Sequence, residues 1–311
     1  MNDAIKQLEQ VITKAMETTS NTATGMGIEY SEDILMKTFQ YAPFLQFLEG
    51  KGQCQDSKTA DVAFFDETPT NSASFIAEGG KVPDFGATTY DVTSDRMKEL
   101  VETISISDMA QQGTDAVNLL QREIDRAFID IHNKIDDTLW NGLGTAAAKD
   151  FARIHKDIPN ANKIDSDGAL SEDAIDDMLI QIVDVQGGHP DVLVTDYFTA
   201  KQLKAINAPY RRYNDKVEIT AGFNVSTYES PDGSELPILI DKNIPTADSG
   251  AKHNLYAIDS SAIEVKYLMR PTMKEVASMN NSRNVTITSF VTARNIAPYM
   301  CGVVENIVAS S

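Results

Sequence analysis

The clearest periodic pattern of apolar residues lies between residues 114 and 141. Its apolar positions recur at steps of three and four residues, the spacing of a single helix face: Val117, Leu120, Ile124, Phe128, Ile131, Ile135 and Leu139. Thr114 suits the N-cap position, and Gly142 follows the periodic run. The pattern predicts one long helix, roughly 40 Å from end to end at 1.5 Å per residue.

The segment ahead of this helix has an extended pattern. Residues 60–65 (ADVAFF) and 99–107 (ELVETISIS) predict strands, and alternation in the second places Ile104 and Ile106 on one face. Between them, residues 74–95 combine glycines and a proline, which favour turns, with apolar residues at irregular spacing. Such a segment suits neither a helix nor one regular strand.

Two more helices are predicted near the N-terminus. Residues 2–18 have an amphipathic pattern, and the polar string that follows separates them from the rest, so this helix is either a docking arm or a frayed end. A second helix is predicted to begin at Ser31, an N-cap residue followed by two acidic residues. Its predicted core face consists of Ile34, Leu35, Phe39 and Phe44.

The second half of the chain alternates helix and strand patterns. A helix over 171–185 begins with Ser171 as its cap, a short buried strand spans 190–196, and another helix spans 196–206. A Pro-Asp-Gly turn joins predicted strands at 223–228 and 236–240. Further strands are predicted at 254–259, 262–269, 284–294 and 299–308. This alternation indicates a mixed α/β unit.

The composition is strongly acidic, with 46 acidic and 27 basic residues. The 311 residues carry a net charge of −19, which argues against sequence-specific DNA binding. Composition alone favours solubility as the reason for this charge, which is also compatible with a container whose acidic wall does not hold the DNA it encloses. No apolar run reaches the ~20 residues of a membrane span, and the N-terminus lacks a secretory pattern, so a soluble, cytosolic product is expected. Cys54 and Cys301 are expected to be free thiols.

No catalytic, cofactor-binding or metal site is predicted. The four histidines, His132, His155, His189 and His253, lie on separate elements without ligand spacing, and His132 is expected to be solvated. The acidic pairs Asp136-Asp137 and Asp176-Asp177 are also interpreted as solvated helix faces.

Three local motifs are interpreted as ordinary structure. GLGTAA at 142–147 follows a helix, whereas a dinucleotide fingerprint follows a strand. DSDG at 165–168 lacks the flanking ligands of a calcium loop and is interpreted as a polar turn. The basic clusters at 153–156 and 211–212 lack the interleaved aromatics of a nucleic-acid groove and could meet an acidic patch on a neighbouring copy.

The order of these elements resembles the major capsid protein of tailed bacteriophages, the HK-ninety-seven-type fold. The resemblance covers roughly residues 58–300. It rests on the A-E-G-x-x-x-P segment at Ala77–Pro83, the long helix ending in DDTLWNGLG, the segment PDVLVTDYFTAKQLKAI and the closing strands from 262 onward. It implies an α+β fold with an N-terminal arm, an extended E-loop hairpin, a peripheral domain with a long spine helix, and a mixed α/β axial domain.

The resemblance also implies domain boundaries. The N-terminal arm is 1–30; the peripheral domain is 31–55, 108–150 and 264–296, with its spine helix at 114–141; the E-loop is 56–107, with a tip near Gly79–Gly86; the axial domain is 151–263 and 297–311. Two E-loop arms of about 15 residues would project on the order of 50 Å. In the family this loop lies across a neighbouring subunit.

The implied function is structural and not enzymatic: an icosahedral shell that encloses double-stranded DNA in the virion and assembles in the host cytoplasm. The expected partners are other copies in pentamers and hexamers, a portal, a decoration protein, and a separate scaffolding protein or the 2–18 helix in its place. No membrane partner or cofactor is expected. The isopeptide cross-link of some relatives is not carried over to Lys81 or Lys98 in the arm.

Two other interpretations remain open. One is an encapsulin-like compartment of the same fold, whose inner wall holds cargo instead of a genome. The other is a soluble α/β hydrolase or binding protein, which would require a convergent polar pocket.

Overall fold

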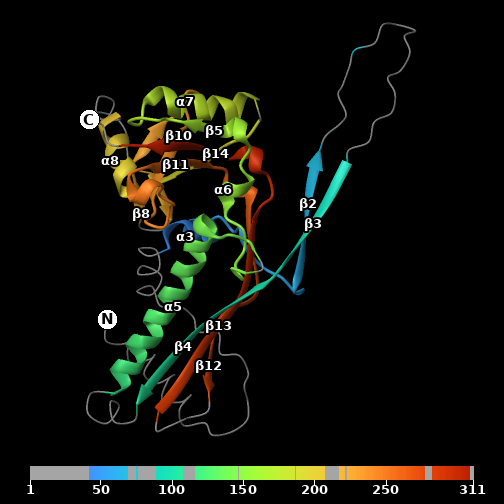
Figure 1. Cartoon of the computed structure of the whole chain (residues 1–311), viewed down its shortest axis with the longest axis vertical. Coiled ribbons are helices and arrows are strands. Elements are labelled where there is room, and N and C mark those ends of the chain that lie inside the picture. The colour runs from blue at the N-terminus through green and yellow to red at the C-terminus, as the bar shows by residue number, and fades with distance from the viewer. Residues whose placement is uncertain are drawn as a thin grey trace.

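The computed structural model describes residues 42–68, 75, 89–107, 116–145, 147–185, 187–206, 217–220, 223–276 and 282–308. The predictions for the arm at 1–30, its helix at 2–18, the helix start at Ser31, the cap Thr114, the Gly79–Gly86 tip and the 211–212 cluster lie outside these residues. Figure 1 shows a body with a sheet at each end, the long helix α5 beside one of them, and a two-stranded hairpin that projects away from the body.

One end of the body is a six-stranded mixed sheet. Its strand order is β5 (Lys163–Asp165), β14 (Gly302–Ile307), β11 (His253–Ile258), β6 (Val192–Thr195), β10 (Glu235–Ile240) and β9 (Thr227–Glu229). All four residues of β6 are buried, as the apolar run predicted for this strand. The helices α7 (Glu172–Ile180) and α8 (Tyr197–Ile206) lie beside this sheet. The hydroxyl of Ser171, the predicted N-cap of α7, accepts a 3.2 Å hydrogen bond from Ala174 N.

The other end is a four-stranded sheet. Its order is β1 (Cys54–Asp56), β12 (Ile263–Val276), β13 (Ser282–Asn295) and β4 (Lys98–Ser107). The 14-residue strands β12 and β13 form its centre. On β4, Ile106 is buried and Ile104 is partly buried against the core, so the predicted alternation is confirmed.

Short elements complete the described chain. They are α6 (Ile154–Asp157), the 3-10 turns η1 (Asn160–Asn162), η3 (Asp248–Gly250), η4 (Ser260–Ala262) and η5 (Pro298–Met300), the π-helical turn η2 (Gln181–Val185), and the antiparallel pair β7 (Val217–Thr220) and β8 (Phe223–Val225).

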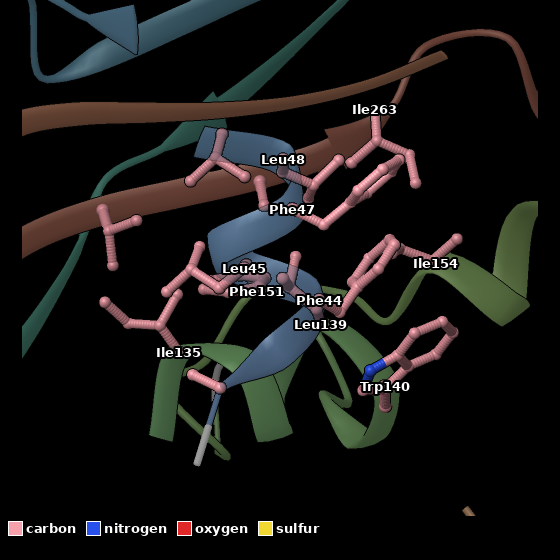
Figure 2. Packing of buried hydrophobic residues seen from close by; sticks show 14 of the residues in the cluster. Phe44, Leu45, Phe47, Leu48, Ile135, Leu139, Trp140, Phe151, Ile154 and Ile263 are labelled. Carbon is pink, nitrogen blue, oxygen red and sulfur yellow. The ribbon is translucent and has the colours of Figure 1, made fainter. Parts of the chain in front are cut away.

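The long helix predicted at 114–141 is confirmed as α5 (Ala116–Asn141). Five members of its predicted apolar face, from the part of the helix whose burial the structure describes, are buried: Ile124, Phe128, Ile131, Ile135 and Leu139. The helix α3 (Pro43–Gly50) packs on α5 through Phe44, Leu45 and their neighbours, as Figure 2 shows. The core is therefore built where α3 and α5 meet.

Gly142 follows α5, as predicted, and the reason is a close backbone approach. A Cβ at this position would lie 2.1 Å from the carbonyl oxygen of Phe151 and 2.6 Å from that of Thr138. Any side chain would push the following segment away from the helix end.

Trp140, at the end of α5, joins both halves of the body. Its ring lies 4.7 Å from that of Phe44 and 4.8 Å from that of Tyr256, between centroids. Its indole N–H donates a 2.8 Å hydrogen bond to Asp241 Oδ2, directly after β10. One fully buried side chain thus connects α5 to α3 and to the six-stranded sheet.

The prediction that Asp136 lies on a solvated face is wrong. Asp136 is fully buried, where its Oδ1 accepts from Leu45 N and its Oδ2 accepts from Asn243 Nδ2, both at 2.8 Å. The Asp241 carboxyl group lies close by and adds a like charge. Burial, followed by the charge of Asp241, raises the pKa of Asp136 well above its usual value.

His132 was also predicted to be solvated and is buried instead. Its Nδ1 donates to the Phe128 carbonyl at 2.7 Å, so the polar group is satisfied within the helix. Burial lowers the pKa of His132, which favours the neutral ring.

Two predicted elements differ in extent. Strand 223–228 is divided at Ser226, whose carbonyl accepts from Ile238 N, so β8 pairs with β7 while β9 pairs with β10. The predicted helix over 171–185 changes at Gln181 from α-helical to π-helical geometry. The Pro-Asp-Gly turn between β9 and β10 is present as predicted.

Leu139→Ala tests the core on α5. Because Leu139 is fully buried, its truncation leaves a cavity, and the free energy of unfolding should fall by about 2–5 kcal/mol in urea denaturation. Val101→Ala on β4, an exposed site, should change it by about 0.5 kcal/mol or less. Equal losses in the two variants would contradict this placement of the core.

Asp136→Asn tests the raised pKa of Asp136. As pH rises from the usual pKa of an aspartate through the raised pKa of Asp136, the wild-type free energy of unfolding should fall, because the folded state holds a proton that the unfolded chain has already released. An amide at position 136 does not titrate, so the variant should show a flatter profile over this pH range. Asp137→Asn, at the neighbouring ion pair with Lys134, should keep the wild-type profile; identical slopes for wild type and Asp136→Asn would contradict the raised pKa.

Candidate subunit interface

The projecting hairpin consists of β2 (Asp61–Thr68) and β3 (Thr89–Arg96). The two strands are antiparallel and pair along their full length, from Asp61↔Arg96 to Thr68↔Thr89. Among the described residues no third strand joins them, and Figure 1 shows them standing clear of the body. An isolated two-stranded ribbon is at best marginally stable in water, and both of its edges offer unpaired backbone groups.

The hairpin base is fixed to the body on one side. β3 leads directly into β4, with only Met97 between them, and Met97 N donates to Ala60 O at 2.9 Å. Val62, Phe64 and Met97 form a small buried cluster against two partly buried residues from the body, Phe290 and Ile296. The hairpin is therefore oriented by the four-stranded sheet.

Arg294 on β13 reinforces this anchor. Its guanidinium donates to Asp95 Oδ2 on β3 at 3.1 Å and lies 5.7 Å from the centroid of the Phe64 ring on β2. One body residue thus holds both strands of the hairpin through an ion pair and a cation–π contact.

Beyond the base, apolar side chains are exposed to water. Val92 on β3 is 54% exposed and Phe75, between the two strands, is fully exposed. Apolar surface of this kind favours contact with another polypeptide, because burial removes it from water.

A hollow of about 240 Å³, here called the base hollow, lies where the hairpin base meets the body. It is lined by residues of the β3–β4 junction, the 144–157 segment and β13: Asp95, Arg96, Lys98, Gly144, Asp150, Phe151, Ala152, Lys156, Asp157, Thr292, Ala293 and Arg294. Among the described residues, Arg96, Lys98 and Lys156 make no ion pair or hydrogen bond through their side chains. The hydroxyl of Thr292, a residue that is 1% exposed, has no hydrogen-bond partner.

Two of the acidic residues in the base hollow are already engaged. Asp95 pairs with Arg294, and the Asp150 carboxylate accepts from Leu143 N at 3.1 Å and Gly144 N at 2.9 Å. Four cationic side chains face three carboxylates there, in a chain whose net charge is −19. The base hollow is locally cationic.

The histidines do not assemble into a reactive centre within the described residues. His155 lies 3.2 Å from the Tyr256 hydroxyl and 3.3 Å from Glu305, and burial followed by Lys163 and Arg153 lowers its pKa to about 4. His253 pairs with Asp196 and stacks on Phe198, while His189 is exposed.

The remaining candidate groups occupy structural positions. Asp176 accepts a 2.8 Å hydrogen bond from the Tyr228 hydroxyl, so it is a tether between α7 and β9 and not the solvated group that was predicted. Cys54 and Cys301 are free thiols, and burial raises the pKa of each to about 12.

The DSDG segment begins at Asp165, the last residue of β5, and no group of three potential metal ligands occurs among the described residues. No helix in the described part of the chain has the length and hydropathy required to cross a membrane.

Sequence reasoning missed the base hollow and the Trp140–Asp241 contact. The residues lining the base hollow come from positions 95 to 294, and Trp140 and Asp241 are 101 positions apart. No local pattern marks such pairs. Lys98 and Lys156 were noticed only as members of the arm and of a basic cluster.

Solved structures with a similar fold are shells. The encapsulin SrpI from Synechococcus elongatus PCC 7942 matches with a TM-score of 0.65 at 8% identity, covering 96% of this chain and 95% of that one. The capsid protein of cyanophage A-1(L) matches with a TM-score of 0.63 at 11% identity, covering 95% and 99%. A structure described as Mycobacterium phage Bobi matches with a TM-score of 0.58 at 14% identity, covering 97% and 98%. At these identities the likeness shows the fold, which phage capsids and encapsulins share.

A match to a protein-family model favours a phage capsid protein over an encapsulin. No curated protein sequence matches the chain. The model of the SU10 major capsid protein matches residues 12–308, nearly the whole length. The chain therefore belongs to the SU10 major capsid protein family, and it is a structural, non-enzymatic protein of a bacteriophage capsid that assembles from many copies.

Proposed function

We propose that this capsid protein forms an icosahedral shell of pentamers and hexamers around the double-stranded DNA of a tailed phage. The observation that carries the proposal is the hairpin β2–β3, which is firmly anchored at its base yet exposes apolar side chains and both sheet edges beyond it. Closed rings of identical copies need contacts between two different patches, and a projecting hairpin supplies one of them.

In this proposal the segment 56–107 is the E-loop and α5 is the spine helix. The peripheral domain comprises 31–55, 108–150 and 264–296, and the axial domain comprises 151–263 and 297–311. The membership of the two sheets supports most of this division, because β12 and β13 belong to one sheet whereas β5, β6, β11 and β14 belong to the other. The exception is β4, which pairs with β13, so the projecting part of the proposed E-loop ends at Arg96.

The acidic balance supports a container for DNA. A net charge of −19 per copy repels the phosphate backbone, so enclosed DNA would not adhere to the wall through the average charge of the subunit. The shell assembles in the host cytoplasm with a scaffolding protein or the 2–18 segment, a portal and a decoration protein as further partners. These partners are proposed from the family resemblance.

Removal of the hairpin tests its role in assembly. Because Met97 N and Ala60 O are hydrogen-bonded at 2.9 Å, a short glycine linker can replace residues 61–96 without separating the flanking strands. The shortened chain should keep its circular dichroism spectrum and form no shells in negative-stain images, since each copy loses its projecting contact.

A matched control shortens a different hairpin. Replacing the exposed turn residues 231–233 between β9 and β10 by two glycines alters a loop without touching β2 or β3. The control should still assemble. Shells of normal size from the chain that lacks 61–96 would contradict the proposed role of the hairpin.

Particles purified from infected cells separate a phage shell from an encapsulin-like compartment. A phage shell built from this chain should hold double-stranded DNA that resists added nuclease until the particle is opened. Particles filled with protein and free of protected DNA would instead favour the compartment.

A further inference from the structure

The paired strands of the hairpin place acidic residues opposite one another. In the register of β2 and β3, Asp66 lies directly opposite Asp91, and Glu67 is next to Asp66. Like charges at opposed positions destabilise a two-stranded sheet. Over both strands there are five acidic residues, Asp61, Asp66, Glu67, Asp91 and Asp95, and only one basic residue, Arg96.

Arg96, the one basic residue of β2 and β3, lies too far along the strand to neutralise this pair. Arg96 lies opposite Asp61 at the base, five residues from both Asp66 and Asp91. Five residues of extended strand span about 17 Å. For the same reason, the base hollow of the same subunit, which begins at Asp95 and Arg96, is out of reach of Asp66.

The base hollow contains basic side chains without ion-pair partners in the described part of the chain. Arg96, Lys98 and Lys156 line one concave space, and none has an ion-pair partner among the described residues. The buried Thr292 hydroxyl also lines it without a hydrogen-bond partner.

We propose that the base hollow of one subunit receives the Asp66–Asp91 region of the hairpin of a neighbouring copy. This inference rests on the proposed function, in which the hairpin crosses a neighbour, and it names the receiving surface. Every copy carries both the acidic donor and the cationic receiver, so the contact is heterologous and repeats around a ring. Charge complementarity of this kind selects the partner and fixes the register of the contact.

A double charge reversal tests the receiver. Lys98→Glu with Lys156→Glu should require about tenfold more protein for half-maximal shell formation, measured by sedimentation, because carboxylates would then face carboxylates. The matched control is Lys201→Glu with Lys204→Glu on α8, where two exposed lysines make no ion pair among the described residues. This control changes the net charge equally and should assemble like the wild type.

A charge swap separates a lost contact from a damaged fold. Adding Asp66→Lys and Asp91→Lys to the Lys98→Glu, Lys156→Glu chain restores opposite charges between copies, so assembly should recover to near the wild-type level. A chain that failed to fold would not recover. The hairpin reversal alone should impair assembly as strongly as the receiver reversal alone.

Each of the following outcomes would overturn the inference. If the receiver reversal assembles as the wild type does, the base hollow does not receive the hairpin, although the shell function stands. If inorganic phosphate raises the melting temperature of the wild type but not of the receiver reversal, and the swap restores nothing, the base hollow is a small-anion site. A wild type that forms no shells with its scaffold would overturn the proposed function and this contact together.

Discussion

The buried contact between Trp140 and Asp241 is the interaction on which the architecture depends most. It ties the end of α5 to the segment after β10, while the ring of Trp140 lies between Phe44 and Tyr256. One side chain therefore fixes the end of α5 against α3 and the six-stranded sheet, within an apolar cluster that also includes residues of the four-stranded sheet. Asp136 adds a second connection nearby, since its carboxyl group accepts from Leu45 N and Asn243 Nδ2.

A rigid body of this kind explains why the hairpin stands apart. The apolar faces of α5, α3 and both sheets are already covered within the subunit. Only three buried residues, Val62, Phe64 and Met97, form the cluster at the hairpin base, so the body has little apolar surface left to hold the hairpin beyond it. Because β3 continues into β4, the orientation of the projecting strands follows that of the four-stranded sheet.

The sequence predicted those elements whose signal is local. The periodicity of α5 and the apolar run of β6 can be recognised within one continuous stretch of sequence, and both elements form as expected. Asp136 and His132 were assigned to solvent because polar residues on a helix usually face it. Asp136 is satisfied by Leu45 and Asn243, 91 and 107 positions away, and no periodicity reveals such partners. The resemblance of the arm to an E-loop identified the hairpin, but the receiving surface depends on residues that meet only in three dimensions.

The acidic composition places a constraint on how such subunits can associate. Copies with a charge of −19 repel one another, but at physiological ionic strength exposed charges farther apart than about 8 Å are largely screened. Attraction between copies must therefore come from short-range contacts: buried apolar surface and locally opposite charges. The base hollow concentrates four cations beside the root of an acidic hairpin, although the chain has only 27 basic residues against 46 acidic ones. Such a local excess of cations can direct association at short range, while the net repulsion disfavours contacts in any other register.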